Sequence, residues 1–127
     1  MSFRFNPQRG LIMVRAELIG ASGSVNLRLA LDTGATGTMI NVGMLVSIGY
    51  DPSLSLNRTQ VTTGSGVEYV PRIVISKIKV LGQELADFPV LCHTLPPSAG
   101  IDGLLGLDFL RGRRLEIDFR SGEVSLA

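Results

Sequence analysis

The stretch that decides the fold is the run Leu29-Ala30-Leu31-Asp32-Thr33-Gly34-Ala35-Thr36. An alternating apolar segment ends here at a carboxylate, and a glycine follows two residues later. At such a place the backbone can turn sharply and present N–H groups to the carboxylate. The tripeptide Asp-Thr-Gly alone is weak evidence, because chance places it in roughly a few per cent of chains this long. Other features of the sequence must show whether this tripeptide forms a structural turn or a functional site.

A second distinctive element follows later in the chain, in the run Ile101-Asp102-Gly103-Leu104-Leu105-Gly106-Leu107-Asp108-Phe109-Leu110. We expect a short helix over Leu104–Leu110. Between the two elements, strands over Arg58–Thr63 and Val67–Val80 flank Gly64-Ser65-Gly66, which predicts a hairpin with a glycine-rich tip. The predicted order along the chain is therefore strand, Asp-Thr-Gly, hairpin, Leu-Leu-Gly, helix and a final strand.

Period-2 alternation dominates the remaining sequence and predicts strands over Leu11–Ile19, Ser24–Leu31, Gln83–Cys92, Arg114–Phe119 and Glu123–Leu126. The segment Asn41–Gly49 favours a helix, with Asn41 as its N-cap and Gly49 at its C-terminus. We expect an all-β fold, a small closed β-barrel-like sheet with one or two short helices. No stretch is typical of a linker, so residues 1–127 are expected to form a single domain.

This order of elements resembles the retropepsin-like aspartic proteases, the single-lobe relatives of pepsin, over roughly Leu11 to Leu126. Asp32-Thr33-Gly34-Ala35 matches the catalytic motif of that family, and Leu104-Leu105-Gly106 matches its hydrophobic-hydrophobic-glycine motif. The helix predicted near Asn41–Gly49 is similar to one in bacterial and cellular members and is lacking in viral ones.

The resemblance implies a role for each matching residue. It implies that Asp32, Thr33 and Gly34 form the catalytic loop, with Thr33 bonding across a twofold axis. It further implies a structural support for that loop at Leu104, Leu105 and Gly106, and substrate contacts at Ala35, Thr36 and the flap-tip residues Gly64, Ser65 and Gly66.

Aspartic proteolysis needs two carboxylates around one water, and the chain has one Asp-Thr-Gly. The other aspartates read as turn, cap or surface residues: Asp51, Asp87, Asp102, Asp108 and Asp118. We therefore expect a symmetric homodimer in which two copies of Asp32 hydrolyse extended peptides, without a metal or cofactor. The alternative is a dimerisation or peptide-binding module that uses the same fold without catalysis.

Two positions depart from the viral members of the family. These place an Asp after the catalytic motif and an Arg after the second glycine, where this chain has Thr36 and Leu107. That ion pair cannot form here, and Asp108 is the candidate to replace it. The N-terminal segment 1–9 has two interpretations, a flexible arm or an interface strand, the second favoured by the alternation of Phe3 and Phe5.

Composition excludes several classes of protein. A net charge of +1 does not suit a nucleic-acid partner, and a content of 45% hydrophobic and 18% charged residues is not typical of disorder.

The single cysteine, Cys92, excludes an intramolecular disulfide. Because Cys92 and His93 are neighbours on a strand, their side chains should point to opposite faces rather than pair for catalysis. The chain shows no transmembrane run and no signal-peptide core near Met1, so we expect no membrane partner and a cytoplasmic location.

Overall fold

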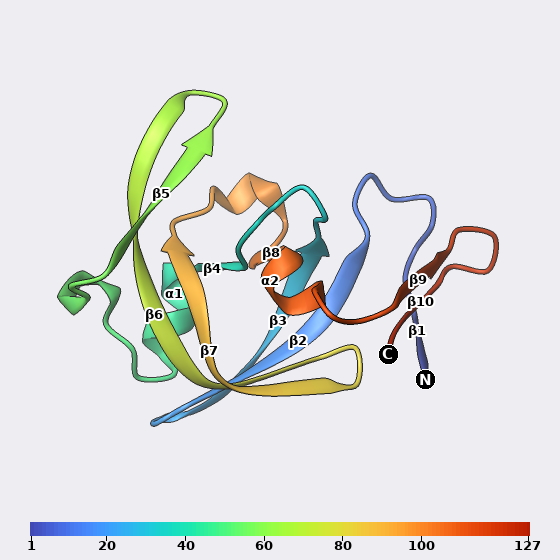
Figure 1. Ribbon diagram of the computed structural model, residues 1–127, viewed down its shortest axis with the longest axis horizontal. Coiled ribbons are helices and arrows are strands. Elements are labelled where there is room, and N and C mark those ends of the chain that lie inside the picture. The colour runs from blue at the N-terminus through green and yellow to red at the C-terminus, as the bar shows by residue number, and fades with distance from the viewer.

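Six strands close a β-barrel in the computed structural model, which describes residues 1–127 apart from the side chain of Thr63 (Figure 1). Their order around the barrel is β2 (Met13–Gly20), β3 (Gly23–Leu31), β8 (Gly103–Leu105), β4 (Met39–Asn41), β7 (Gln83–His93) and β6 (Gly66–Val80). Pairing of β6 with β2 completes the ring. The predicted all-β barrel with two short helices is confirmed.

The alternation of the first two strands builds one wall of the core. In β2, Val14, Ala16 and Leu18 are buried, and they face Leu27 and Leu29 of β3. A tight turn joins the strands, with Gly20 paired to Gly23. Burial of alternate side chains on one face is what the period-2 pattern encodes. The apolar face therefore leads β3 directly to Asp32.

A long hairpin stands out from the barrel at one end of the molecule (Figure 1). Its strands are β5 (Arg58–Thr63), which lies at the edge of the sheet beside β6, and the first half of β6. The helix α1 (Val42–Ser47) is capped by Asn41, whose side chain accepts a hydrogen bond from the Gly43 N–H. Short 3-10 helices lie at η1 (Pro52–Leu54) and η2 (Pro97–Ala99).

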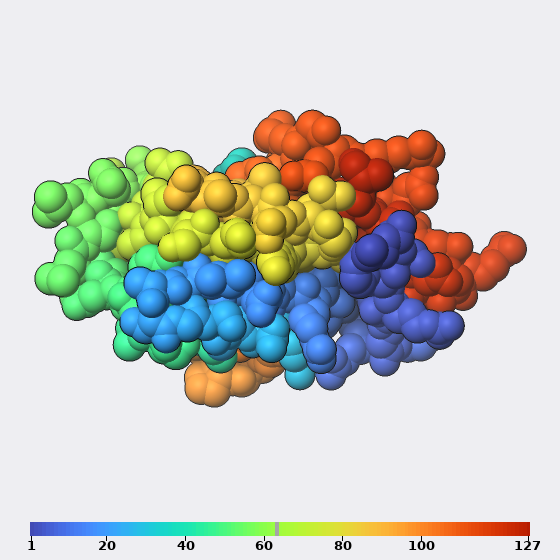
Figure 2. Space-filling view, turned by 90° about the horizontal axis from the view of Figure 1, so that it is seen from below, coloured from blue at the N-terminus to red at the C-terminus, as the bar shows by residue number. Residues whose placement is uncertain are grey.

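The two chain ends form a small sheet of their own, with β1 (Ser2–Arg4) and β9 (Leu115–Asp118) on either side of β10 (Glu123–Leu126). Figure 2 shows the N-terminal segment lying against the C-terminal one. Phe5 is buried behind β1, and its ring meets that of Phe119 edge to face at 5.6 Å. Residues 2–4 are therefore a strand paired within their own chain, which contradicts the interpretation as a flexible arm. The interpretation as an interface strand stays a prediction.

The segment that follows Asp102 differs from its prediction. The expected helix over Leu104–Leu110 is instead the strand β8, an extended Gly106, and a single helical turn, α2 (Leu107–Leu110). The cause is tertiary, because β8 lies between β3 and β4 and its backbone is satisfied by those neighbours. The strand β4 was not predicted, since a segment of three residues shows no period. Within the described chain, no helix is long and apolar enough to span a membrane.

Candidate active site

The Asp32 loop leaves the end of β3 and turns back on its own carboxylate. The Asp32 N–H donates to the Leu105 carbonyl at 3.0 Å, which ties the aspartate to β8. The Gly34 N–H then donates to Asp32 Oδ1 at 2.9 Å, and the Ala35 N–H donates to the Asp32 carbonyl at 3.2 Å. The carboxylate therefore has a defined orientation before any partner is bound.

Gly106 supports this loop from behind by close backbone contact. A Cβ at Gly106 would lie 2.7 Å from the Gly37 carbonyl carbon and 2.9 Å from the Ala35 oxygen, so no side chain fits. The next residue, Leu107, donates its N–H to the Ala35 carbonyl at 2.8 Å. The glycine after the two leucines is thus required by the approach of α2 to the loop.

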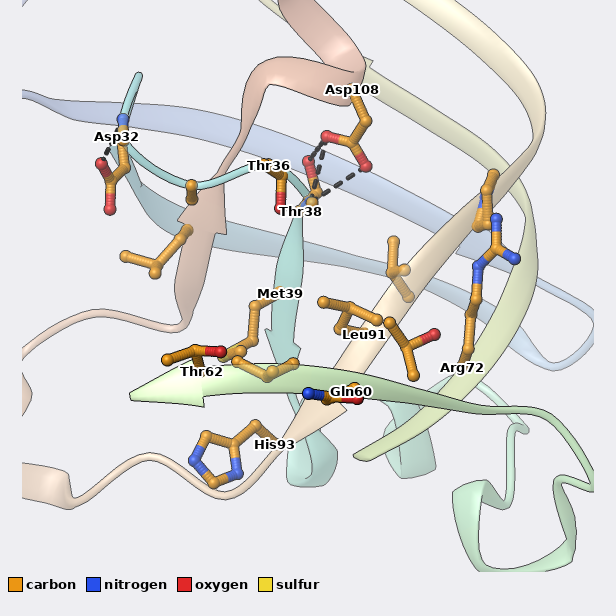
Figure 3. Close-up of a pocket in the computed structure, with 18 residues that line it drawn as sticks. Asp32, Thr36, Thr38, Met39, Gln60, Thr62, Arg72, Leu91, His93 and Asp108 are labelled. Carbon is orange, nitrogen blue, oxygen red and sulfur yellow. Dashed lines mark hydrogen bonds between the residues drawn. The ribbon is translucent and has the colours of Figure 1, made fainter. Parts of the chain in front are cut away.

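A polar network joins the end of the loop to α2, as Figure 3 shows. Thr38 is fully buried; its hydroxyl donates to Asp108 Oδ1 at 2.7 Å and accepts from the Gly106 N–H at 3.1 Å. Asp108 also accepts from the N–H groups of Thr38, at 3.0 Å, and Phe109, at 2.9 Å. Asp108, the residue that the sequence analysis named to replace the missing ion pair, therefore links the end of the loop to α2.

A cleft of about 770 Å³ lies beside the loop, between the barrel wall and the hairpin. It is lined by five of the residues to which the resemblance assigns a role, Asp32, Gly34, Ala35, Thr36 and Leu104, and also by Asp108 and His93. Thr33 is exposed at the surface, whereas Leu105 and Gly106 are buried behind the loop. Gly64, Ser65 and Gly66 lie at the hairpin tip and do not line this cleft.

The floor of the cleft was not foreseen from the sequence. Four paired residues form a row across neighbouring strands, namely Leu104 of β8, Met39 of β4, Leu91 of β7 and Arg72 of β6. All four line the cleft, with Gln60 and Thr62 of β5 on the hairpin side (Figure 3). Alternation marks such residues as one face of a strand, but only the sheet order brings them into one row.

Three of the other four aspartates accept hydrogen bonds from nearby backbone N–H groups. Asp51 caps η1 by accepting from the Ser53 N–H at 3.0 Å, and Asp102 accepts from the Arg28 N–H at 2.8 Å. Asp118 accepts from two backbone N–H groups of its turn, which lower its pKa. Asp87 adopts a left-handed φ of 51° within β7. None of these aspartates lines the cleft.

Cys92 and His93 lie on opposite sides of β7. Cys92 is buried in the core, where burial raises its pKa from 9.0 to about 11, against a smaller lowering by a backbone hydrogen bond with Ile73. His93 lines the cleft and has Glu68 Oε2 3.8 Å from its Nε2. A protonated thiol that faces away from the imidazole is a core residue and not a nucleophile.

The fold is retropepsin-like. A strand ends in Asp-Thr-Gly, Gly106 packs against the loop that follows, and the β5–β6 hairpin borders the same cleft. A family model described as aspartyl protease matches residues 14–109, and the chain belongs to that family. A search of curated proteins finds no match. Among solved structures, a retropepsin-like aspartic protease from Rickettsia conorii is similar in fold, with a TM-score of 0.73 and 17% identity over 100% of this chain and 91% of that one.

Proposed function

We propose that this protein is a homodimeric aspartic endopeptidase in which two copies of Asp32 activate one water. The observation that carries the proposal is the Asp32 loop itself, which is oriented and braced but lies at the surface of a single chain. Thr33 and Gly34 are exposed and Asp32 is half-buried. A second copy of the chain can therefore reach this loop, and a twofold axis beside it would bring two equivalent carboxylates together.

The reaction follows from sharing one proton between the two carboxyl groups. Neighbouring carboxylates do not both ionise readily, so one member of such a pair stays protonated. The ionised member takes a proton from the water as it attacks the scissile carbonyl, and the protonated member donates a hydrogen bond to the carbonyl oxygen. The two acids supply both functions, so this mechanism calls for no metal or cofactor.

The loop geometry suits this chemistry. Gly34 holds Oδ1 of Asp32, and no hydrogen bond from the described residues reaches Oδ2, which can therefore face the water. The Thr33 hydroxyl likewise has no hydrogen bond within the described chain, and we assign it a bond across the axis to the partner loop. Such a bond would fix the separation of the two carboxylates.

The substrate in this proposal is an extended peptide lying between the hairpin and the cleft floor. Ala35 and Thr36 line the cleft next to the carboxylate and would contact the peptide near the scissile bond. The flap tip, Gly64, Ser65 and Gly66, would close over the substrate and exclude water. Backbone pairing supplies affinity in such strand-like binding, and alternate side-chain pockets supply specificity.

The test compares Asp32→Asn with Asp87→Asn in purified protein on a mixture of peptides. Asn at position 32 keeps the shape but removes the acid, so cleavage should fall at least about a thousandfold, the scale expected for a lost acid–base group. Asp87 is exposed and its left-handed backbone accepts Asn, so the control should cleave normally. Cleavage that survives Asp32→Asn would overturn the proposal.

Subunit mixing tests the shared site separately. Wild-type protein equilibrated with an excess of Asp32→Asn should lose activity, because mixed dimers carry one acid. Dilution should lower specific activity, because dimers dissociate by mass action. Activity unaffected by both treatments would place the second acid in the same chain. Saturable peptide binding with the peptide intact after hours would favour the alternative, a binding module.

A further inference from the structure

The cleft contains a positive charge at the end of its floor. The row Leu104, Met39, Leu91 and Arg72 crosses β8, β4, β7 and β6, and paired residues of adjacent strands point to the same face. Three strand-to-strand steps of about 4.8 Å make this row about 14 Å long. Figure 3 shows Asp32 and Arg72 at opposite sides of the cleft, with Met39 and Leu91 between them.

The Arg72 side chain is the positively charged group of the cleft lining, and its interactions decide whether that charge is free to bind a substrate. The Asp108 carboxylate already accepts hydrogen bonds from Thr38 and Phe109, and the His93 imidazole lies beside the Glu68 carboxylate. No hydrogen bond or ion pair of the Arg72 guanidinium is found among the described residues, although Arg72 also lines a second hollow together with Asp51 and Asp87. Its charge is therefore available to a molecule in the cleft.

The backbone of Arg72 is held in place on both sides. Its N–H donates to the Asn57 carbonyl at 2.9 Å, and its carbonyl accepts from the Ser55 hydroxyl at 2.8 Å. The segment 55–57 thereby fixes the strand where the hairpin leaves the barrel. An anchored arginine loses less freedom on binding than one on a loose loop, and its planar fork matches a carboxylate bidentately.

We propose that Arg72 is a specificity residue that selects an acidic side chain in the substrate, at a position remote from the scissile bond. This inference rests on the proposed function and names its substrate class. An extended peptide advances about 3.3 Å per residue, so the 14 Å row corresponds to about four residues. The apolar middle of the row favours uncharged side chains between the scissile bond and the acid. By twofold symmetry, the same preference holds on the other side.

The experiment uses peptides with acetylated and amidated ends, so that only side chains carry charge. Pairs that differ by Glu or Gln are compared at each position from the second to the fifth on both sides of the cleaved bond. We expect Glu to raise kcat/KM about fivefold at the preferred position, the scale of one partly solvated charge-assisted hydrogen bond. Arg72→Gln should bring the ratio to about one, and Arg72→Lys should retain part of it.

Two controls separate charge selection from other effects. Arg15→Gln removes another exposed arginine, which lies on β2 outside the cleft, and should leave the Glu/Gln ratio unchanged. Raising the salt concentration to 0.5 M should lower the ratio in the wild type, because exposed charges are screened. Equal cleavage of Glu and Gln peptides by the wild type, or a ratio that Arg72→Gln does not change, would overturn the inference.

The failure of this inference is distinguishable from failure of the proposed function. If the protein cleaves no peptide, the same pairs are measured by fluorescence anisotropy for binding to Asp32→Asn and to Asp32→Asn/Arg72→Gln. Tighter binding of Glu peptides that disappears in the double variant supports Arg72 as the selecting residue even without turnover. Equal binding of both peptides overturns it.

Discussion

The Asp32 loop and the β5–β6 hairpin border the same cleft but are held in different ways. The loop is tied to β8 and α2 by backbone hydrogen bonds, by the buried Thr38 and by the close approach of Gly106. The outer part of the hairpin is held by its own ladder and carries exposed Val67 and Tyr69. A group that performs chemistry must keep its position, whereas a cover must allow the substrate to enter.

The difference predicts that equal substitutions have unequal effects in the two regions. In the loop, neighbouring backbone leaves no space for added atoms and buried polar groups depend on one another. In the hairpin, side chains face solvent and can be exchanged at little cost. The following variants test this contrast, beginning with the largest expected effect.

Gly106→Ala should destabilise the protein most. The new Cβ would meet the backbone of Gly37 and Ala35 within 3 Å, and backbone cannot rotate away, so we expect a loss of about 3 kcal/mol and displacement of the Asp32 loop. Gly64→Ala at the hairpin tip meets nothing within 4 Å and should change stability by less than about 0.5 kcal/mol. Urea denaturation measures both, and equal values would refute the contrast.

Thr38→Val should cost about 2 kcal/mol, because the variant keeps the shape but leaves the Gly106 N–H and part of Asp108 without a partner. The matched control is Thr62→Val on β5, where the residue is exposed and Val suits a strand. It should be neutral or slightly stabilising. Thermal unfolding of the pair gives the comparison, and a neutral Thr38→Val would mean that the network does not brace the loop.

The third prediction concerns the barrel core, where the buried Cys92 thiol should make the free energy of unfolding depend on pH. Because its pKa is raised in the folded state from 9.0 to about 11, the neutral thiol contributes stability that is fully present below pH 9. That contribution is lost as pH rises from 9 toward 11, by about 1 kcal/mol at pH 10. Unfolding free energies of wild type and Cys92→Ala between pH 8 and 10.5 should therefore converge. Parallel curves would show that the thiol titrates freely.

Glu68→Gln should have the smallest effect. Glu68 lies 3.8 Å from His93 where the hairpin meets the cleft, and both side chains are partly solvated, at 49% and 34% exposure. Solvent screening limits such a pair to less than about 0.5 kcal/mol. A loss above about 1 kcal/mol would show that the hairpin is anchored more firmly than its exposed surface indicates.

The local features of the site could be predicted from the sequence. Asp32-Thr33-Gly34 after an apolar strand identified the loop, and Leu104-Leu105-Gly106 identified the segment that supports it. The helix near Asn41 and the long hairpin were foreseen because caps, glycines and alternation are local signals. The prediction of a helix over Leu104–Leu110 was wrong in its first half, since the same apolar run suits a buried strand.

The sequence by itself therefore determined most of the secondary-structure elements, which alternation, caps and glycines encode. It also identified Asp32 as the candidate catalytic acid. Only the tertiary structure decided that three-residue strands β4 and β8 pair side by side, that Thr38 meets Asp108, and that Leu104 and Arg72 share one cleft floor. The reason is physical. These contacts join residues far apart in sequence, and their partners are chosen by barrel closure rather than by any periodicity within a segment.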